Sequence, residues 1–359
     1  MERKASFCRI VGFLALIFVF LITAGYSLAA EKQTGKTKVE TLIFATASAG
    51  SASYAGGAGI STVAQKVMPD KLRVLPKPTS GITVQLRMLE ARKANLVNIM
   101  QDVFSDVLKG EGSFSGKKAL KNAQDLRALW PWSLSVYYGM VRSGLADKVK
   151  SLRDIEGHNV FMCPAGSGPY KLWTKVVGAL GLTNKIHVKN IDYKMLPDAI
   201  KIKEVDVVLV YGRVNSVMSY LSQAEAMNRL TVIRPTAEEL KTIGQKYRIW
   251  SKPYAYTFPV KMFSHDIGVG KDEKIKNICQ YGYAACYKDS MSDQAAYNLV
   301  KLVMENVDDL VAAAPTQFTS LKYMIKLKQV KDWFESLDTL GLKLHPGAEK
   351  YFKDSGWIQ

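Results

Sequence analysis

Cysteine and histidine are scarce in this 359-residue sequence, which contains only four of each. Cys8 lies near the start of the chain, and the three others are Cys163, Cys279 and Cys286. Because three is an odd number, no disulfide scaffold fits them. The sequence has no Cys-x-x-Cys pair, and its histidines show no metal-ligand spacing; they are His158, His187, His265 and His345. We therefore expect neither a disulfide-stapled fold nor a metal site.

Catalytic signatures are also missing. No Gly-x-Ser-x-Gly nucleophile elbow occurs. Residues 110–118 (GEGSFSGKK) have the wrong spacing for a phosphate-binding loop, and Lys118 stands where such a loop has Ser or Thr. Low-complexity tracts and fixed-period repeats are absent, which argues against disordered and solenoid proteins. The sequence gives no sign of an enzyme, and we expect no cofactor.

The first thirty residues differ from the rest of the chain. Three basic residues precede the apolar run 10–22, and Ser27 and Ala29 then form a small-x-small cleavage pattern. These are the three parts of a secretory signal peptide, predicted over residues 1–29. The run is shorter than the roughly 20 residues that span a bilayer, although an uncleaved anchor is an alternative. We predict export to the periplasm, without a lipid anchor because no cysteine follows the run.

Acidic residues are outnumbered by basic ones, and the net charge is +17. Removal of residues 1–29 would leave +15. Such a charge favours the approach of anions, although a solvated basic surface explains it equally simply. The lysines are spread along the chain without an aromatic-interleaved stripe, so nucleic acid is not an expected partner.

Short apolar segments alternate with helical patterns along the first part of the chain. Strands are predicted at 41–45, 72–75 and 96–100, with helices at 60–67 and 84–92 between them. This βαβαβ order predicts an α/β fold with a parallel sheet covered by helices.

The second part repeats the plan. Strands are predicted at 136–141, 159–162 and 205–211, with helices at 170–180 and 196–203. After Pro259 the chain becomes mostly helical, and the expected helices are 274–287, 293–305 and 319–327. The first of these three places Cys279 and Cys286 on a helix.

Two similar α/β halves followed by returning helices predict two lobes with a ligand cleft between them. We assign residues 30–131 together with 258–359 to lobe I, and residues 132–257 to lobe II. The length suits two cores of this size.

Three strand-to-helix junctions share a composition rich in Ser, Thr and Gly. They are 46–54 (TASAGSASY), 79–83 (TSGIT) and 164–169 (PAGSGP). The first N–H groups of a helix lack intrahelical partners and lie at the positive end of its dipole, so such openings bind anions. Ligands of open α/β sheets also gather at the carboxyl ends of strands. For any single junction, ordinary capping by Ser or Thr is the alternative.

The junctions and three nearby polar residues supply the candidate ligand-binding set. Asp102 ends an apolar strand and could orient a ligand amine or cap the next turn. Arg213 could bind a carboxylate through both arms of its guanidinium, or lie on the surface. Aromatic residues at 130, 132, 137 and 138 could wall a ligand or pack in the core. The full set is Ser48, Gly50, Ser51, Ser53, Tyr54, Thr79, Ser80, Gln101, Asp102, Ser167, Gly168 and Arg213.

These motifs, in this order, resemble the TAXI-type solute receptors of tripartite ATP-independent periplasmic (TRAP) transporters. The resemblance extends from about Thr41 to Gly356. It is carried by Thr46, Ser48, Gly50 and Tyr54 of the first junction, and by 78–89, 94–102, SLRDIEG (151–157), PAGSG (164–168) and LHPGAEKYF (344–352).

The resemblance implies a type II periplasmic-binding fold that captures its ligand by hinge closure. It implies delivery to integral membrane permease subunits driven by an ion gradient, and ligands such as glutamate-like amino acids or oxo- and dicarboxylates. The chain departs from the family pattern at Ala47, Ser51, Ser80, Ile82, Gln85 and 212–214, positions that touch the ligand. The ligand therefore stays open beyond a small organic anion, and we expect a monomer.

Two other functions are compatible with the sequence. A secreted hydrolase could use Ser167 or Ser51 as its nucleophile, but no His or Lys is placed by sequence to act as its base. A sensory ligand-binding protein could use the same scaffold.

Overall fold

The computed structural model describes residues 39–359, apart from Ser48, Gly50, Gly166, Asn215, Ser251 and Lys328. The chain separates into Met1–Glu40 and Thr41–Gln359, and the description concerns the second unit. The predicted signal peptide lies outside the described residues.

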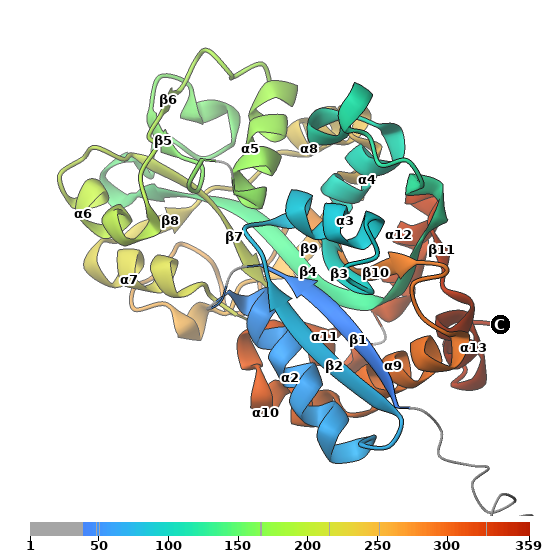
Figure 1. The fold of residues 1–359 in the computed structure, drawn as a ribbon. Coiled ribbons are helices and arrows are strands. Elements are labelled where there is room, and N and C mark those ends of the chain that lie inside the picture. Colours follow the sequence, from blue (N-terminus) through green and yellow to red (C-terminus); the bar gives the residue numbers. More distant parts are fainter. Residues whose placement is uncertain are drawn as a thin grey trace, which may run out of the picture. The chain divides into compact units, whose positions relative to one another are not determined.

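Eleven strands of the described chain form one sheet, in the order β2-β1-β3-β10-β4-β7-β5-β6, with β8 and β11 added on β4 and β9 on β10 (Figure 1). The strands are β1 Glu40–Thr46, β2 Leu72–Pro78, β3 Leu96–Met100, β4 Leu126–Arg142, β5 Asn159–Phe161, β6 His187–Val188, β7 Val207–Arg213, β8 Leu230–Val232, β9 Tyr254–Thr257, β10 Lys274–Tyr287 and β11 Lys343–Leu344.

Helices cover this sheet on both faces. They are α2 Ala52–Val67, α3 Ile82–Glu90, α4 Gln101–Lys109, α5 Gly168–Ala179, α6 Leu196–Lys201, α7 Ser219–Met227, α8 Ala237–Lys246, α9 Asp293–Glu305, α10 Val307–Ala313, α11 Pro315–Lys326, α12 Val330–Leu340 and α13 Pro346–Asp354. None of those described is long and apolar enough to cross a membrane.

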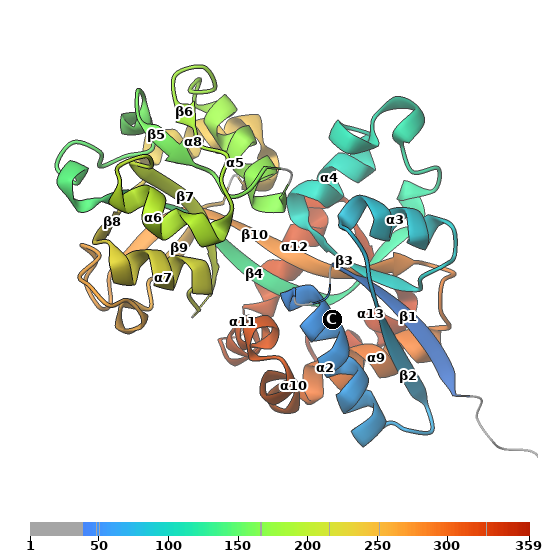
Figure 2. The ribbon, with the colours of Figure 1, turned by 60° about the vertical axis from the view of Figure 1, so that its left-hand side comes forward.

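The predicted α/β fold is confirmed, with parallel pairing in both halves. β1 pairs with β3 in parallel, and β5 pairs in parallel with β6 and β7. The two groups are joined through β4 and β10, which pair antiparallel with each other and with β7 and β3 respectively. In Figure 2, α5 to α8 gather around one end of these long strands, and α2, α3 and α9 to α13 around the other.

The predicted helix over 274–287 is wrong, because this segment is the strand β10. β10 lies between β3 and β4, so its second half is buried on both faces and reads as a continuous apolar run. Such a run cannot be told from a buried helix by periodicity alone. Cys279 and Cys286 therefore lie on a strand, and both are free thiols.

Pro131 does not interrupt β4, which was expected to begin only at 136. The strand runs for 17 residues through Pro131, opposite Tyr283 of β10. Pairing shifts register on either side of Tyr283, between Gly282 and Tyr283 and between Ala284 and Ala285. A proline without an N–H is accommodated at such irregularities. Because β4 and β10 are continuous, the lobe boundaries at 131/132 and 257/258 stay predictions.

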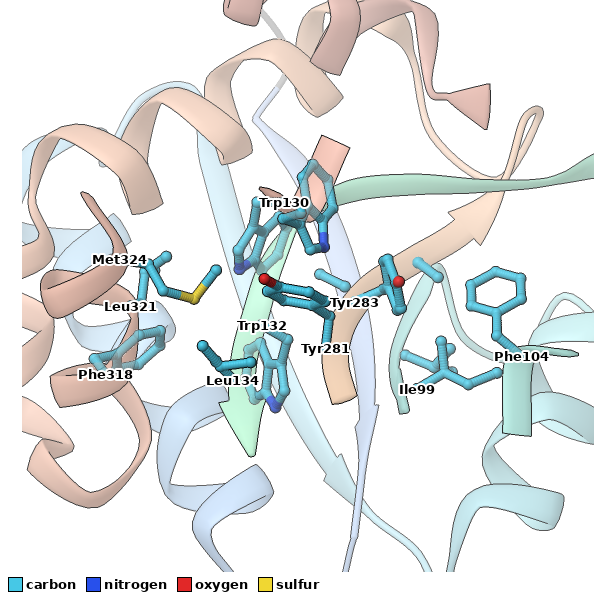
Figure 3. Packing of buried hydrophobic residues seen from close by; sticks show 14 of the residues in the cluster. Ile99, Phe104, Trp130, Trp132, Leu134, Tyr281, Tyr283, Phe318, Leu321 and Met324 are labelled. Atoms are coloured by element: carbon cyan, nitrogen blue, oxygen red, sulfur yellow. The ribbon is translucent and has the colours of Figure 1, made fainter. Parts of the chain in front are cut away.

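The larger core lies around β4 and β10 (Figure 3). Trp132 packs edge-on against Phe318 of α11 at 5.8 Å between ring centroids, and against Phe44 of β1 at 5.2 Å. On the other side of the sheet, Phe104 of α4 packs against Tyr283 at 5.7 Å. A second buried cluster lies beneath α5 and α8.

Candidate functional site

A pocket of about 370 Å³ lies where the openings of α2, α3 and α5 meet. Its walls also include β3, the first turn of α4, the middle of β4 and β10, and the end of β7. The lining residues are Ala47, Ser53, Ser80, Gly81, Ile82, Gln85, Asn98, Met100, Asp102, Val103, Trp132, Ser133, Ser135, Tyr137, Ser167, Gly168, Pro169, Lys171, Tyr211, Arg213 and Gln280.

The opening of α2 is capped by its own serine. Ser51 Oγ accepts from the N–H of Tyr54 at 3.1 Å, so Ser51 serves the capping role that was the alternative to ligand binding. Ser53 lies in the first turn of α2 and lines the pocket. Its hydroxyl accepts from Ala47 N–H at 3.2 Å and donates to Asn98 Oδ1. Ser48 and Gly50 lie outside the described residues.

The opening of α3 has no side-chain cap. Its N-cap is Gly81, with φ of 149°, a conformation that favours glycine. Thr79 fixes this turn, because its hydroxyl donates to Thr46 O at 2.8 Å and accepts from Gly81 N–H at 3.3 Å. Ser80 and Gly81 line the pocket, whereas Thr79 does not. The helix opening without a serine cap thus faces the cavity.

The opening of α5 belongs to the second half of the chain and reaches the same pocket. Ser167 Oγ accepts from Tyr170 N–H at 3.2 Å, which caps the helix as Ser51 does. Ser167, Gly168 and Pro169 all line the pocket. All three predicted junctions therefore converge on one cavity.

Arg213 enters the pocket from the end of β7 rather than lying on the surface. Its Nη1 donates to Gln317 Oε1 at 2.6 Å and to Thr316 O at 2.8 Å, both on α11. Among the described residues, no ion pair is formed with a carboxylate. Its Nε is buried without a hydrogen-bond partner. Burial lowers the pKa of the Arg213 guanidinium, which nevertheless stays charged.

Asp102 lies in the first turn of α4 and is 2% exposed. Burial raises the pKa of its carboxyl group, and the Lys175 ammonium opposes this. Its backbone N–H donates to Gln280 Oε1 at 3.2 Å, and Gln280 Nε2 donates to the Tyr137 hydroxyl at 2.7 Å. A carboxyl, an amide and a phenol are thus held together along one wall.

Gln101 and Tyr54 do not line this pocket. Gln101 precedes Asp102 on α4 and lines a different cavity, next to Tyr281 and α12. Its side-chain oxygen accepts from Tyr281 N–H at 3.4 Å. Of the described candidates, six line the pocket: Ser53, Ser80, Asp102, Ser167, Gly168 and Arg213. Ligand binding by them stays a prediction.

Sequence reasoning missed several polar residues of the pocket, among them Asn98, Lys171 and Gln280. Asn98 interrupts the apolar run of β3, a signal that could have been used because polar residues within buried strands are unusual. Gln280 was hidden by the wrong helix over 274–287. Lys171 left no distinctive signal in sequence, whereas Gln85 was one of the positions where the chain departs from the pattern of the family it resembles. Gln85 is 2% exposed, and its Oε1 is buried without a partner.

The four tryptophan and tyrosine candidates divide between pocket and core. Trp132 and Tyr137 line the pocket, whereas Trp130 and Tyr138 are core residues, at 0% and 1% exposed. Alternation along β4 explains this for Tyr137 and Tyr138, since successive strand residues face opposite sides. Within the described part of the chain, no group of three or more His, Cys, Asp or Glu residues is arranged to hold a metal ion.

An α/β fold with a polar pocket beside strand ends and helix openings is typical of periplasmic-binding-type solute receptors. A model of the NMT1-like family matches residues 44–356, and the chain belongs to this family.

Three solved structures resemble the chain at low identity. The sulfonate-binding protein SsuA of Methylobacillus flagellatus KT is 13% identical with a TM-score of 0.45, over 89% of this chain and 88% of that one. SsuA of Escherichia coli is 13% identical with a TM-score of 0.41, over 88% and 83%. A protein from Pseudomonas aeruginosa described as a LysR-family regulator is 10% identical with a TM-score of 0.42, over 82% and 80%.

Proposed function

We propose that the protein is a periplasmic solute receptor of the TAXI type, which binds a small organic anion in the pocket and delivers it to the membrane permease subunits of a TRAP transporter. Family membership supports the receptor class. The predicted leader supports its export, and the motifs described above support the TAXI type.

One observation carries the proposed ligand class. The openings of α2, α3 and α5 meet at a single pocket that also receives Arg213, a cation without a carboxylate partner among the described residues. A partly buried charge of this kind is costly unless an opposite charge pairs with it. An anionic group entering the pocket would supply that charge and accept from the helix N–H groups.

Two buried atoms of the pocket residues lack hydrogen-bond partners, namely Arg213 Nε and Gln85 Oε1. Unsatisfied buried groups cost about 1–3 kcal/mol each. After a small rotation of its side chain, Arg213 Nε would donate to a ligand acceptor. Gln85 Oε1 would accept from a ligand donor after a similar rotation. These groups favour a ligand that carries both an anionic group and an N–H or O–H group.

The ligand class is tested by thermal shift and calorimetry with a panel of small carboxylates, including glutamate-like amino acids, oxoacids and dicarboxylates. We expect at least one to raise the Tm, because binding to the folded state stabilises it. Arg213→Met should weaken that binding at least tenfold. Arg248→Met is the control, because Arg248 is exposed and lines a different cavity. Failure of the whole panel would overturn the proposal.

The transporter class requires a separate experiment. In cells of the native host, uptake of the carboxylate identified by the panel should stop when the ion gradient is collapsed while ATP is maintained. Uptake that persists without the gradient and stops when ATP is depleted would contradict the TRAP assignment.

The serine-hydrolase alternative receives no support from the site. Ser51 and Ser167 use their hydroxyl oxygens to accept from Tyr54 N–H and Tyr170 N–H, as helix caps do. A nucleophile needs instead an adjacent base that takes its proton.

A further inference from the structure

A single ion pair connects α4 with α5 beside the pocket. Lys175 Nζ lies 2.9 Å from both carboxylate oxygens of Asp106. α4 belongs to the predicted lobe I and α5 to the predicted lobe II, so this contact crosses the predicted lobe boundary (Figure 2). Both side chains are 23% exposed.

The pair lies one helical turn behind the pocket wall. Asp102 precedes Asp106 by four residues on α4, and Lys171 precedes Lys175 by four on α5, so each pair occupies one face of its helix. Asp102 and Lys171 line the pocket. The acidic face of α4 and the basic face of α5 are therefore directed toward each other beside the ligand space.

Most ion pairs of the described residues are different in kind. Lys66 and Asp309, for example, are 65% and 41% exposed and join α2 to α10, both within predicted lobe I. Such exposed pairs are largely screened by water and contribute little. Arg234–Glu273 and Lys252–Glu335 also cross the predicted lobe boundary, but they are more exposed than Lys175–Asp106. The Lys175–Asp106 pair is better shielded, and it would break if the lobes separated.

We propose that Lys175 and Asp106 are positioning residues whose ion pair favours the closed arrangement of the lobes and thereby sets the affinity for the captured anion. This inference rests on the proposed function. The physical reason is a population shift: if only the closed arrangement binds the ligand, the apparent Kd is divided by the fraction of molecules that are closed. Loss of the pair lowers that fraction without removing a ligand contact.

Spin labels placed on the two lobes test the closure itself. Lys121→Cys and Lys189→Cys supply the label sites, because Lys121 is exposed and Lys189 is half-buried on the surface of the other predicted lobe. Burial raises the pKa values of Cys163, Cys279 and Cys286 to about 12, so the native thiols should react slowly with the label. The measurement is the inter-label distance distribution, without ligand, of the purified full chain in which Cys8 is also replaced by Ser.

We expect a short-distance population that decreases in Lys175→Met and in Asp106→Asn. The double variant should resemble either single variant, because the pair acts as one unit. Lys175→Arg should restore the short population. Salt at about 1 M, where the screening length is about 3 Å, should reduce it in the unmodified protein and leave the double variant unchanged.

Lys66→Met is the matched control, because it removes the same charge from an ion pair within predicted lobe I. Its distances should not change. Equal distributions in the unmodified protein and both single variants would overturn the inference.

Binding of the carboxylate identified by the panel supplies a second measurement. Lys175→Met should weaken it about tenfold, and Lys175→Arg should recover most of the loss. If no carboxylate of the panel binds, the proposed ligand class fails, whereas the spin-label distances still decide the role of the ion pair.

Discussion

Gln280 donates through Nε2 to the hydroxyl of Tyr137 across 2.7 Å, while Gln280 Oε1 accepts from the N–H of Asp102. The amide is thereby fixed at both ends by groups from β4 and α4. Because the Tyr137 oxygen already accepts a hydrogen bond, its own proton is directed elsewhere. Tyr137 lines the pocket, so that proton is available to a bound ligand.

Tyr137→Phe should weaken binding of the panel's best carboxylate about threefold to tenfold, since one hydrogen bond contributes about 0.5–1.5 kcal/mol. Calorimetry measures the change. Tyr138→Phe is the control, because Tyr138 is 1% exposed in the core and does not line the pocket. If both variants bind the carboxylate as tightly as the unmodified protein, Tyr137 does not donate to the ligand.

The pKa of Asp102 predicts a pH-dependent stability. Burial raises this pKa, so the folded protein holds the Asp102 proton more tightly than the unfolded chain does. The contribution of Asp102 to the free energy of unfolding therefore falls as pH rises through the raised pKa. Above the raised pKa the charged carboxylate is buried at a cost, and below the ordinary value of 3.8 this cost is absent.

Asp102→Asn should accordingly raise the ligand-free Tm at pH 7 by a few degrees. The difference from the unmodified protein should shrink as pH falls toward 3.8. Thermal melts across this pH range measure it. Asp147→Asn, a change at an exposed position, should leave the Tm almost constant. A Tm of Asp102→Asn below that of the unmodified protein at pH 7 would contradict the expected sign.

Gly56 marks a close approach between α2 and its neighbours. A Cβ at this position would lie 2.7 Å from Gln317 Cγ and 2.9 Å from the Trp132 ring. Gly56→Ala should therefore destabilise the protein by about 1–3 kcal/mol despite the better helix propensity of alanine. Denaturant unfolding measures this change.

Gly178 on α5 provides the matched comparison. A Cβ there would meet only Thr183 Oγ1, at an ordinary 3.6 Å. Gly178→Ala should stabilise the protein by up to about 1 kcal/mol, since alanine is preferred within helices. Destabilisation of similar size in both variants would mean that the packing around Gly56 is not the cause.

The composition of the three junctions was enough to predict where the candidate site lies. The three junctions were recognised because Ser, Thr and Gly at a helix opening suit anion binding as well as capping, and residues of all three line the cavity. Composition could not predict which role each residue of the junctions has. Ser51 and Ser167 cap helices, Thr79 fixes a turn, and Ser53 contacts Asn98, as their hydrogen bonds show. These differences arise from side-chain directions that depend on neighbours distant in sequence.

The sequence by itself determined the α/β class and the strand–helix alternation of 41–100, because these depend on local periodicity and turn residues. Only the tertiary structure decided that 274–287 is a strand, since its central place between β3 and β4 makes it apolar on both faces. It also decided that Arg213 reaches into the pocket and binds Gln317 of α11, and that Lys175 meets Asp106. Such pairings join residues dozens to more than a hundred positions apart, and no local pattern encodes them.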